Sequence, residues 1–452
     1  MSPPTLTRQA PGVIYWFRND LRLHDPVALS HAIGRAQALG GWLLPVFVHD
    51  TRNQARTPWG FERMGPYRRT WLGMALDDLQ SQLKCLGSCL IQSHGQPVQC
   101  LSAWVQALGQ PLVVCEEIAA PEEQSDIAEL QRLGVKVETV WQSTLMSPES
   151  LPFTPVQMPD LFTAFRQKVE RHGTPPAAPM PAIQTLPPAP DASLMAKALA
   201  SHSATRFAPA TQAWPDARSA LAWDQPAWGG GERAALAHLA QYVRRGLPHS
   251  YKATRNGLLG LDYSSKWSPW LATGALSPRT AWAAIAEFES EHGASDSSYW
   301  LRFELLWRDH FRWLHHKYGA RLYRAQGLGH DKRPSHDEAA FARWCAGQTG
   351  HEWIDAGMRE LAATGYLSNR MRQNVASYLI HDLTCDWRAG AAWFEAMLID
   401  YDVYSNQGNW LYLSGRGTDA RANRRFNPEL QAQNYDPDGI YRRTWVSSPD
   451  DQ

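Results

Sequence analysis

The chain has 452 residues, more than one hydrophobic core usually serves, so we expect two or three domains. Lys plus Arg and Asp plus Glu both number 44, so overall charge does not point to nucleic acid. Any such contact needs a local basic face, such as the one with Arg416, Arg421, Arg424 and Arg425.

The six cysteines lack disulfide-framework spacing and metal-ligand spacing, so we expect free thiols, a reducing compartment and no metal. The amino terminus is unlike a secretory signal, and no apolar stretch approaches membrane-spanning length. These features predict a cytoplasmic protein without membrane contact.

Residues 10–145 are expected to form an α/β domain. Short runs rich in β-branched residues alternate with helix-length segments such as 65–84 and 122–133. This alternation predicts a doubly wound parallel sheet, although no GxGxxG fingerprint of a dinucleotide site follows the first strand. The predicted strands are 13–17, 43–48, 90–93, 112–115 and 135–140.

Residues 146–215 are rich in proline and alanine, which predicts a long interdomain connector lying on the surface, with one helix near 159–172. Residues 216–446 show helical periodicity almost throughout from Gly231. This last part is predicted to be one large all-α domain.

Within residues 364–412, charged and amide side chains lie among large aromatic rings. The polar members are Arg372, Asp400, Asp402 and Asn406, and the aromatic ones are Trp387, Trp393, Trp410 and Tyr412. Rings this dense are also found in plain cores. Together with a carboxylate, guanidinium and amide cluster, they are what a redox cofactor needs, because polar groups tune its electronics.

This stretch resembles the flavin-binding helical domain of the cryptochrome/photolyase family. Residues 16–25 are similar to the family's opening strand and loop, and residues 254–279 to its flavin-diphosphate loop. ELLWRDHFRW (304–313) and residues 426–445 match as well, so the resemblance spans nearly the whole chain. The motifs YSSKWSPWLA, SNRMRQNVAS and GNWLY are most similar to the cryptochrome-DASH branch.

The resemblance implies an α/β antenna domain followed by an all-α domain that binds FAD. Arg372 and Asp400 would pair beside the isoalloxazine, Asp402 would accept from its N3–H, and an amide facing N5 would favour an anionic reduced flavin. The SSKWS run would hold the diphosphate at a helix start, although a capped helix before a proline is the commoner meaning. The implied cofactor residues are Tyr251, Ser264, Ser265, Lys266, Trp267, Ser268, Arg308, Arg372, Asp400, Asp402 and Asn406.

A catalytic pocket for an extruded pyrimidine dimer is implied too, and its residues are Glu304, Trp307, Asn369, Gln373 and Tyr412. Glu304 would hydrogen-bond a thymine, and Trp307 would stack on it. From spacing alone, Glu304 and Arg308 predict an ion pair on one helix face. Duplex-repairing photolyases carry Trp and Met where this chain has Tyr412 and Gln373. The smaller stacker and the polar wall imply a preference for single-stranded or looped DNA.

Trp410 and Trp387 match the first two members of the family's electron relay, but Pro334 stands where the third, surface Trp is expected. Electrons either stop short or leave through Trp344, Trp353 or Trp393. Glu117 matches the glutamate that binds a 5,10-methenyltetrahydrofolate antenna, while a deazaflavin or no antenna stays open.

The implied function is that of a monomeric cryptochrome-DASH-like deoxyribodipyrimidine photo-lyase. Blue light would drive electron transfer from reduced FAD to cyclobutane pyrimidine dimers, chiefly in single-stranded DNA. One alternative is a blue-light photoreceptor that binds FAD and repairs nothing. Another is a generic ligand-binding protein whose tryptophans are only core, which a colourless protein would support.

Overall fold

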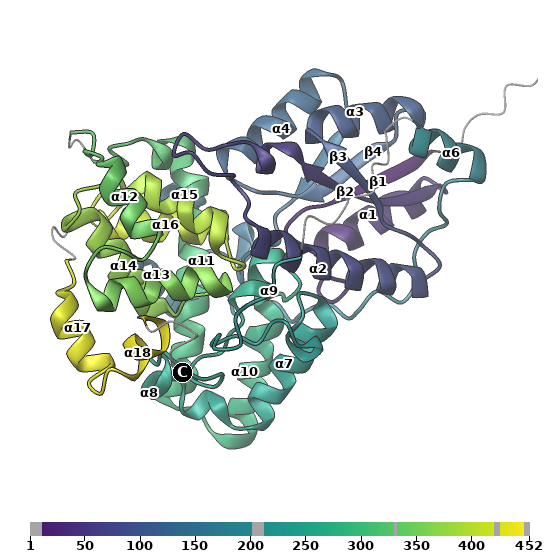
Figure 1. Ribbon diagram of the computed structural model, residues 1–452. Coiled ribbons are helices and arrows are strands. Elements are labelled where there is room, and N and C mark those ends of the chain that lie inside the picture. The colour runs from purple at the N-terminus through teal and green to yellow at the C-terminus, as the bar shows by residue number, and fades with distance from the viewer. Residues whose placement is uncertain (1–10, 201–211, 330–331, 420–424, 447–452) are drawn as a thin grey trace, which may run out of the picture.

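The computed structural model describes residues 11–200, 212–329, 332–419 and 425–446. An α/β part built from the amino-terminal residues lies beside a larger helical part (Figure 1). None of the described helices combines the length and the apolar character needed to span a membrane.

The predicted parallel sheet is confirmed. Its order is β3-β2-β1-β4-β5, and every neighbouring pair is parallel. All six residues of the central strand β1 are buried, as expected where helices cover both faces. The strands are β1 (Gly12–Phe17), β2 (Trp42–Asp50), β3 (Ile91–Gly95), β4 (Leu112–Glu116) and β5 (Val137–Val140).

Helices cover both faces of this sheet. The core on one face includes α1 (Val27–Ala38) and α2 (Pro66–Cys85), and the core on the other includes α3 (Pro97–Ala107) and α4 (Pro121–Arg132). The order of the strands reverses between β1 and β4, so the carboxyl ends of these two strands meet where such sheets bind ligands.

We predicted that the connector lies on the surface, but the structure shows that parts of it are buried. The expected helix forms as α5 (Phe162–His172), but Phe162 and Phe165 enter the core of the helical part. A second helix, α6 (Ala192–Ala200), was not predicted, and its Ala198 carbonyl accepts from Trp104 Nε1 at 3.2 Å. The connector therefore contributes to both parts, and the domain bounds at 145 and 215 remain a prediction.

The remaining chain is helical, as predicted. Its helices are α7 (Glu232–Arg244), α8 (Tyr251–Thr254), α9 (Ser268–Thr273), α10 (Pro278–His292), α11 (Asp296–Tyr318), α12 (Glu338–Cys345), α13 (Glu352–Thr364), α14 (Asn369–His381), α15 (Trp387–Met397), α16 (Val403–Leu413), α17 (Pro428–Tyr435) and α18 (Ile440–Val446). Short 3₁₀ helices are η1 (Thr51–Gln54), η2 (Pro148–Ser150), η3 (Pro155–Gln157), η4 (Pro226–Trp228), η5 (Leu247–His249) and η6 (Gly319–Tyr323).

The long helix α11 organises the site. A capping box between Ser295 and Ser298 starts it. Glu304, Arg308 and Arg312 follow at intervals of four residues, so they share one face of the helix. That face turns toward the start of α16 and the loop before α9, which brings distant sequence motifs together.

Candidate functional site

A cavity of about 270 Å³ lies in the helical part and gathers side chains from far apart in the sequence. Every predicted cofactor residue except Asn406 lines it, together with the predicted lesion residues Glu304 and Asn369. The lining cofactor residues are Tyr251, Ser264, Ser265, Lys266, Trp267, Ser268, Arg308, Arg372, Asp400 and Asp402. Their roles remain predictions.

The expected ion pair between Arg372 and Asp400 is present at one wall of this cavity. Arg372 Nη2 donates to Asp400 Oδ2 at 2.8 Å, and the two side chains are 23% and 1% exposed. Arg372 Nε also donates to Leu367 O at 2.8 Å, which fixes the guanidinium. Asp400 Oδ1 is buried and has no hydrogen-bond partner among the described residues, so it can accept from a ligand N–H.

Asp402 is held by Arg312, a residue that sequence reasoning did not single out. Its Oδ2 accepts from Arg312 Nη2 at 2.6 Å, and its Oδ1 accepts from Ser405 N at 2.7 Å and caps α16. Burial acts to raise the pKa of Asp402, but Arg312 and Arg308 outweigh it, and the pKa lies below its ordinary value. The carboxylate therefore stays ionised and can accept hydrogen bonds.

Two cations, the buried Lys266 and the partly exposed Arg308, line the cavity near the SSKWS run. Lys266 Nζ lies 3.3 Å from the Tyr263 ring centroid and 3.3 Å from the Tyr366 hydroxyl, and burial lowers its pKa well below 10.5. Arg308 is partly exposed and donates to the backbone carbonyls of Ser143 and Leu271.

Within the described part of the chain, neither Lys266 nor Arg308 forms a close ion pair. Two aromatic rings and a hydroxyl contact Lys266, and backbone carbonyls bind Arg308. This arrangement fits an anionic ligand such as a diphosphate. Helix α9 starts at Ser268 without a side-chain cap, so the plain capping alternative for SSKWS does not hold.

Spacing predicted an ion pair between Glu304 and Arg308, and this prediction is wrong. Glu304 pairs with Arg255, which follows α8, because Arg308 is turned toward the backbone of Ser143. Neighbours four apart on a helix share a face, but a stronger partner from elsewhere can take either one.

The other predicted lesion residues fall into a second group. Trp307 and Tyr412 line an apolar cavity of about 200 Å³, and their ring centroids are 5.8 Å apart. Phe162 from the connector stacks on Trp307 at 3.8 Å, a contact that the sequence did not reveal. Gln373 lines neither cavity, and its Oε1 accepts from Arg370 Nη1 at 3.1 Å.

Trp387 and Trp410, the two tryptophans predicted to relay electrons, are buried on neighbouring helices, and that role remains a prediction. The Trp410 ring lies against Gly390, where a Cβ would come within 2.2 Å of it, and Gly390 is three residues from Trp387 on α15. Trp387 Nε1 donates to Ala325 O at 3.0 Å. Asn406 donates to Ala391 O at 3.0 Å and lines, with Trp387, a third cavity of about 600 Å³. Its placement at flavin N5 remains a prediction.

Glu117 follows β4 and lies where the sheet faces the helical part. Its amide donates to Val140 O at 2.9 Å, and its Oε1 is 4.0 Å from Nε2 of His316 on α11. The His316 ring meets Trp141 edge-on at 5.7 Å. An acid, an imidazole and an indole thus meet at this junction between the two parts.

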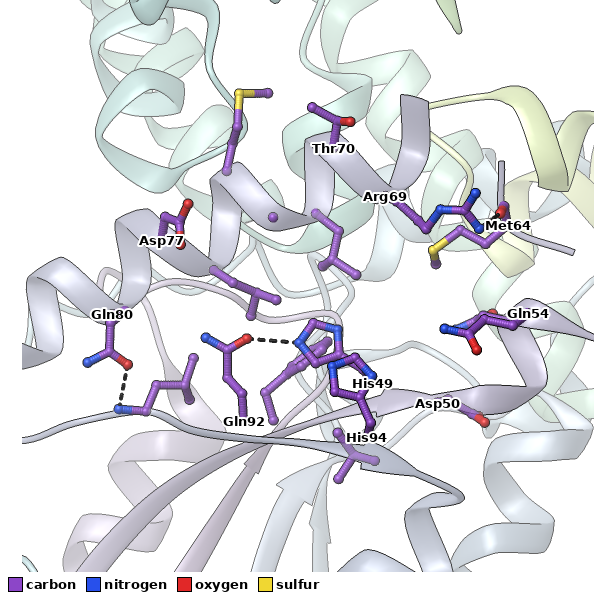
Figure 2. A pocket seen from close by; sticks show the side chains of 18 of the residues that line it. His49, Asp50, Gln54, Met64, Arg69, Thr70, Asp77, Gln80, Gln92 and His94 are labelled. Carbon is purple, nitrogen blue, oxygen red and sulfur yellow. Dashed lines mark hydrogen bonds between the residues drawn. The ribbon is translucent and has the colours of Figure 1, made fainter. Parts of the chain in front are cut away.

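A further cavity, of about 810 Å³, lies between α2 and the carboxyl ends of β2 and β3 (Figure 2). His49 and His94, paired in register on these strands, stack at 4.5 Å, and His49 Nε2 lies 2.8 Å from Gln92 Oε1. Burial lowers the pKa of His49 to about 4, so its ring is neutral near pH 7. Sequence reasoning missed this cavity. The histidines near the ends of two predicted strands were the signal that could have indicated it.

The basic run proposed from the sequence is only partly described. Arg425 forms an ion pair with Asp382. Arg416 lies in the turn that follows α16, where its amide donates to Leu411 O. Arg421 and Arg424 lie outside the described residues. Among the residues that the structure covers, no cluster of His, Cys, Asp and Glu is arranged to hold a metal ion.

Comparison with known proteins agrees with this geometry. Residues 300–451 match the model for the FAD binding domain of DNA photolyase, and residues 13–185 match the DNA photolyase model. Cryptochrome DASH from a Synechocystis species is 41% identical, over 96% of this chain and 87% of its own length. Cryptochrome DASH from Xenopus laevis is 42% identical, over 96% of this chain and 82% of its own length.

Solved structures give the same result. The Synechocystis cryptochrome superposes with a TM-score of 0.88 at 40% identity, covering 98% of this chain and 89% of that one. A class III photolyase from Agrobacterium tumefaciens gives 0.76 at 29% identity, covering 98% and 88%. These matches show that the chain belongs to the cryptochrome/photolyase family and, within it, to the cryptochrome-DASH branch.

Proposed function

We propose that this protein binds FAD in the 270 Å³ cavity and uses blue light to split cyclobutane pyrimidine dimers, preferentially in single-stranded DNA. One observation carries the proposal. Ten residues implied for the cofactor and two implied for the lesion, Glu304 and Asn369, line the same cavity. When bound and reduced, FAD supplies the light-excited electron donor, and the protein supplies position and electrostatics.

The cavity residues divide into two binding tasks. Lys266 and Arg308 place positive charge at the cavity wall for the diphosphate. Asp400 Oδ1 and the ionised Asp402 offer acceptors to ring N–H groups. Arg372 fixes Asp400, a lining residue whose Oδ1 is left without a partner among the described residues. The cations and the acceptors of the cavity therefore fit the cofactor.

Glu304 and Asn369 would hold the dimer by hydrogen bonds, and Trp307 and Tyr412 would pack on its rings. Phe162 covers one face of Trp307, so the apolar cavity shared with Tyr412 is where stacking is available. A tyrosine gives less stacking area than a tryptophan, so less unpairing energy is recovered from duplex DNA. Single strands and loops need less of that energy.

The test is light-dependent recovery of thymine absorbance in a dimer-containing oligothymidine mixed with the reduced protein. Glu304→Gln should lower the yield and the affinity for the dimer while FAD stays bound. Glu289→Gln is the matched control, because Glu289 pairs with Arg302 on α11 and does not line the cavity. Loss of flavin in Glu304→Gln, or equal repair by both variants, would contradict the assigned role.

A photoreceptor without repair activity is the second candidate. Two contacts favour it, because each engages a residue that the lesion would need. Glu304 forms an ion pair with Arg255, and Phe162 stacks on Trp307. A sensor would bind FAD and respond to light, yet leave the dimer intact at any concentration of single strands. The oligothymidine assay therefore separates the two functions.

We also propose that a folate antenna binds at Glu117, beside His316 and Trp141. The cavity of Figure 2 is the rival place for a planar chromophore such as a deazaflavin, with the stacked His49 and His94 at one wall. Glu117→Ala should remove a near-ultraviolet folate band and spare FAD. Gly73→Phe fills the rival cavity, because a Cβ on Gly73 meets nothing within 4 Å. Loss of the second chromophore in that variant alone would contradict the Glu117 site.

A further inference from the structure

The surface end of the electron relay is missing in this chain. The segment with Pro334 packs just before Trp387: Ser335 Oγ donates to Thr384 O at 2.9 Å, and His336 Nδ1 lies 3.4 Å from Asp386 N. The lost ring thus belonged beside Trp387. Of the replacements considered from the sequence, Trp344 and Trp353 are fully buried and cannot exchange a proton with solvent.

A loop from the α/β part reaches this place. After β2, residues 55–63 form a tight turn with an isolated bridge between Arg56 and Glu62, and the loop runs to the helices near α15 (Figure 1). Thr57 N donates to Phe61 O at 2.7 Å, and Gly60 takes a φ of +93°, which favours glycine. Trp59 is at the tip of this turn.

The loop is anchored on the helix that carries Trp387. Arg63 Nε donates to Glu395 Oε1 at 2.6 Å, and Gly65 N donates to Ala396 O at 2.8 Å. Arg63 also binds Glu122 of α4 at 2.5 Å, which ties both parts of the molecule to the turn. The position of Trp59 relative to α15 is therefore fixed by ion pairs and backbone bonds.

Trp59 lies next to the gap. Its ring is 4.7 Å from the His336 ring and 6.4 Å from the Phe341 ring, and the side chain is partly exposed. Its neighbours Thr57 and Pro58 line the same 600 Å³ cavity as Trp387. We propose that Trp59, supplied by the α/β part, is the terminal electron donor in place of the ring that Pro334 replaces.

The inference rests on the proposed FAD site, and its steps balance. Photoexcited oxidised flavin takes one electron from Trp410, Trp387 refills Trp410, and Trp59 refills Trp387. The Trp59 radical cation releases its Nε1 proton to solvent, and an external thiol returns one electron and one proton. Tyr323 is partly exposed and lines the same cavity, and its hydroxyl lies 3.1 Å from Nε2 of the buried His315, so Tyr323 is the rival exit that Tyr323→Phe tests.

The experiment compares photoreduction of the flavin-loaded protein, with excess thiol, by transient absorption. Trp59→Phe should lower the yield of the long-lived tryptophan radical several-fold, and Trp387→Phe should abolish it. Adding Pro334→Trp to Trp59→Phe should restore it. Trp393→Phe removes the remaining candidate exit, a partly exposed indole that packs on Phe61, and should behave as wild type; loss of the radical in this variant alone would overturn the proposal.

A second readout does not depend on the rate. After illumination in air, peptide mass analysis should find an oxidised indole at Trp59 in the wild type and not in Trp387→Phe. If Trp59→Phe photoreduces as wild type while Trp387→Phe is slow, or if Tyr323→Phe alone shows the defect, Trp59 is not the exit and the FAD proposal stands. If the wild-type protein takes up no FAD, the proposed function itself fails.

Discussion

Removing Arg372 tests whether its pair with Asp400 organises the cavity. Arg372→Met leaves a carboxylate with a 1% exposed side chain, one oxygen already unpaired and the other losing its 2.8 Å partner. Breaking one side of a buried pair costs about 3–5 kcal/mol, and the lost bond to Leu367 O, worth about 1 kcal/mol, places the effect at the upper end. A domain is stabilised by about 5–15 kcal/mol in total, so the loss is large.

The double variant separates charge from shape. Arg372→Met with Asp400→Asn removes the stranded charge, and replacing a buried pair by neutral groups is often close to neutral. We expect the double variant to recover most of the loss. Arg370→Met is the control on the same helix, since among the described residues Arg370 donates to two neutral oxygens, Asn256 Oδ1 at 2.9 Å and Gln373 Oε1 at 3.1 Å, and lies over the Tyr435 ring. Losing two neutral bonds should cost about 1–3 kcal/mol.

Urea unfolding of the cofactor-free protein measures all three variants and the wild type. Flavin content after reconstitution gives a second readout, because Asp400 faces the cavity. An Arg372→Met protein no less stable than Arg370→Met would refute the argument. So would a double variant that is no more stable than Arg372→Met.

Three more predictions concern the cavity and its surroundings. Burial holds the pKa of Lys266 well below 10.5, and a bound diphosphate would raise that pKa. FAD affinity, measured by calorimetry, should therefore be greatest below the lowered pKa of the free protein. The affinity should fall as the pH rises through that pKa. Lys266→Met should remove that fall, and an unchanged profile would contradict the assignment. Asn406→Asp must be protonated to keep its bond to Ala391 O, so on photoreduction it should shift the spectrum of the one-electron-reduced flavin toward the neutral form; an anionic spectrum would argue against the N5 position. Phe162→Ala should cost about 3–5 kcal/mol of unfolding free energy, and a loss under about 1 kcal/mol would show that its stack on Trp307 is loose.

The fold was largely predictable because its signals are local. The strand β1 is a continuous apolar run, as a strand buried on both faces must be, and its predicted bounds differ by one residue. The helix α6 was missed because prolines on both sides of it made the whole connector read as extended. The connector's burial was missed because Phe162 and Phe165 pack on α11, far along the chain.

The site was predictable only where a motif carries it. Arg372 and Asp400 are 28 residues apart, and the family resemblance, not their spacing, suggested the pair. Arg312 and Asp402 are 90 residues apart with no motif to join them, so that pair was missed. For Glu304 and Arg308 the error is the reverse, because helical spacing suggested a pair that does not form. Tertiary packing places Arg255 on Glu304 and directs Arg308 to Ser143 O.

The most direct test of the central claim is the yield of dimer splitting per absorbed photon, measured with the reduced, FAD-loaded protein. The same thymine dimer is offered in a single strand, in a hairpin loop and in a duplex. The account predicts splitting in the single strand and the loop, with a much lower yield in the duplex. No splitting in the single strand, by protein that carries reduced FAD in full amount, would contradict the repair function and favour a light sensor.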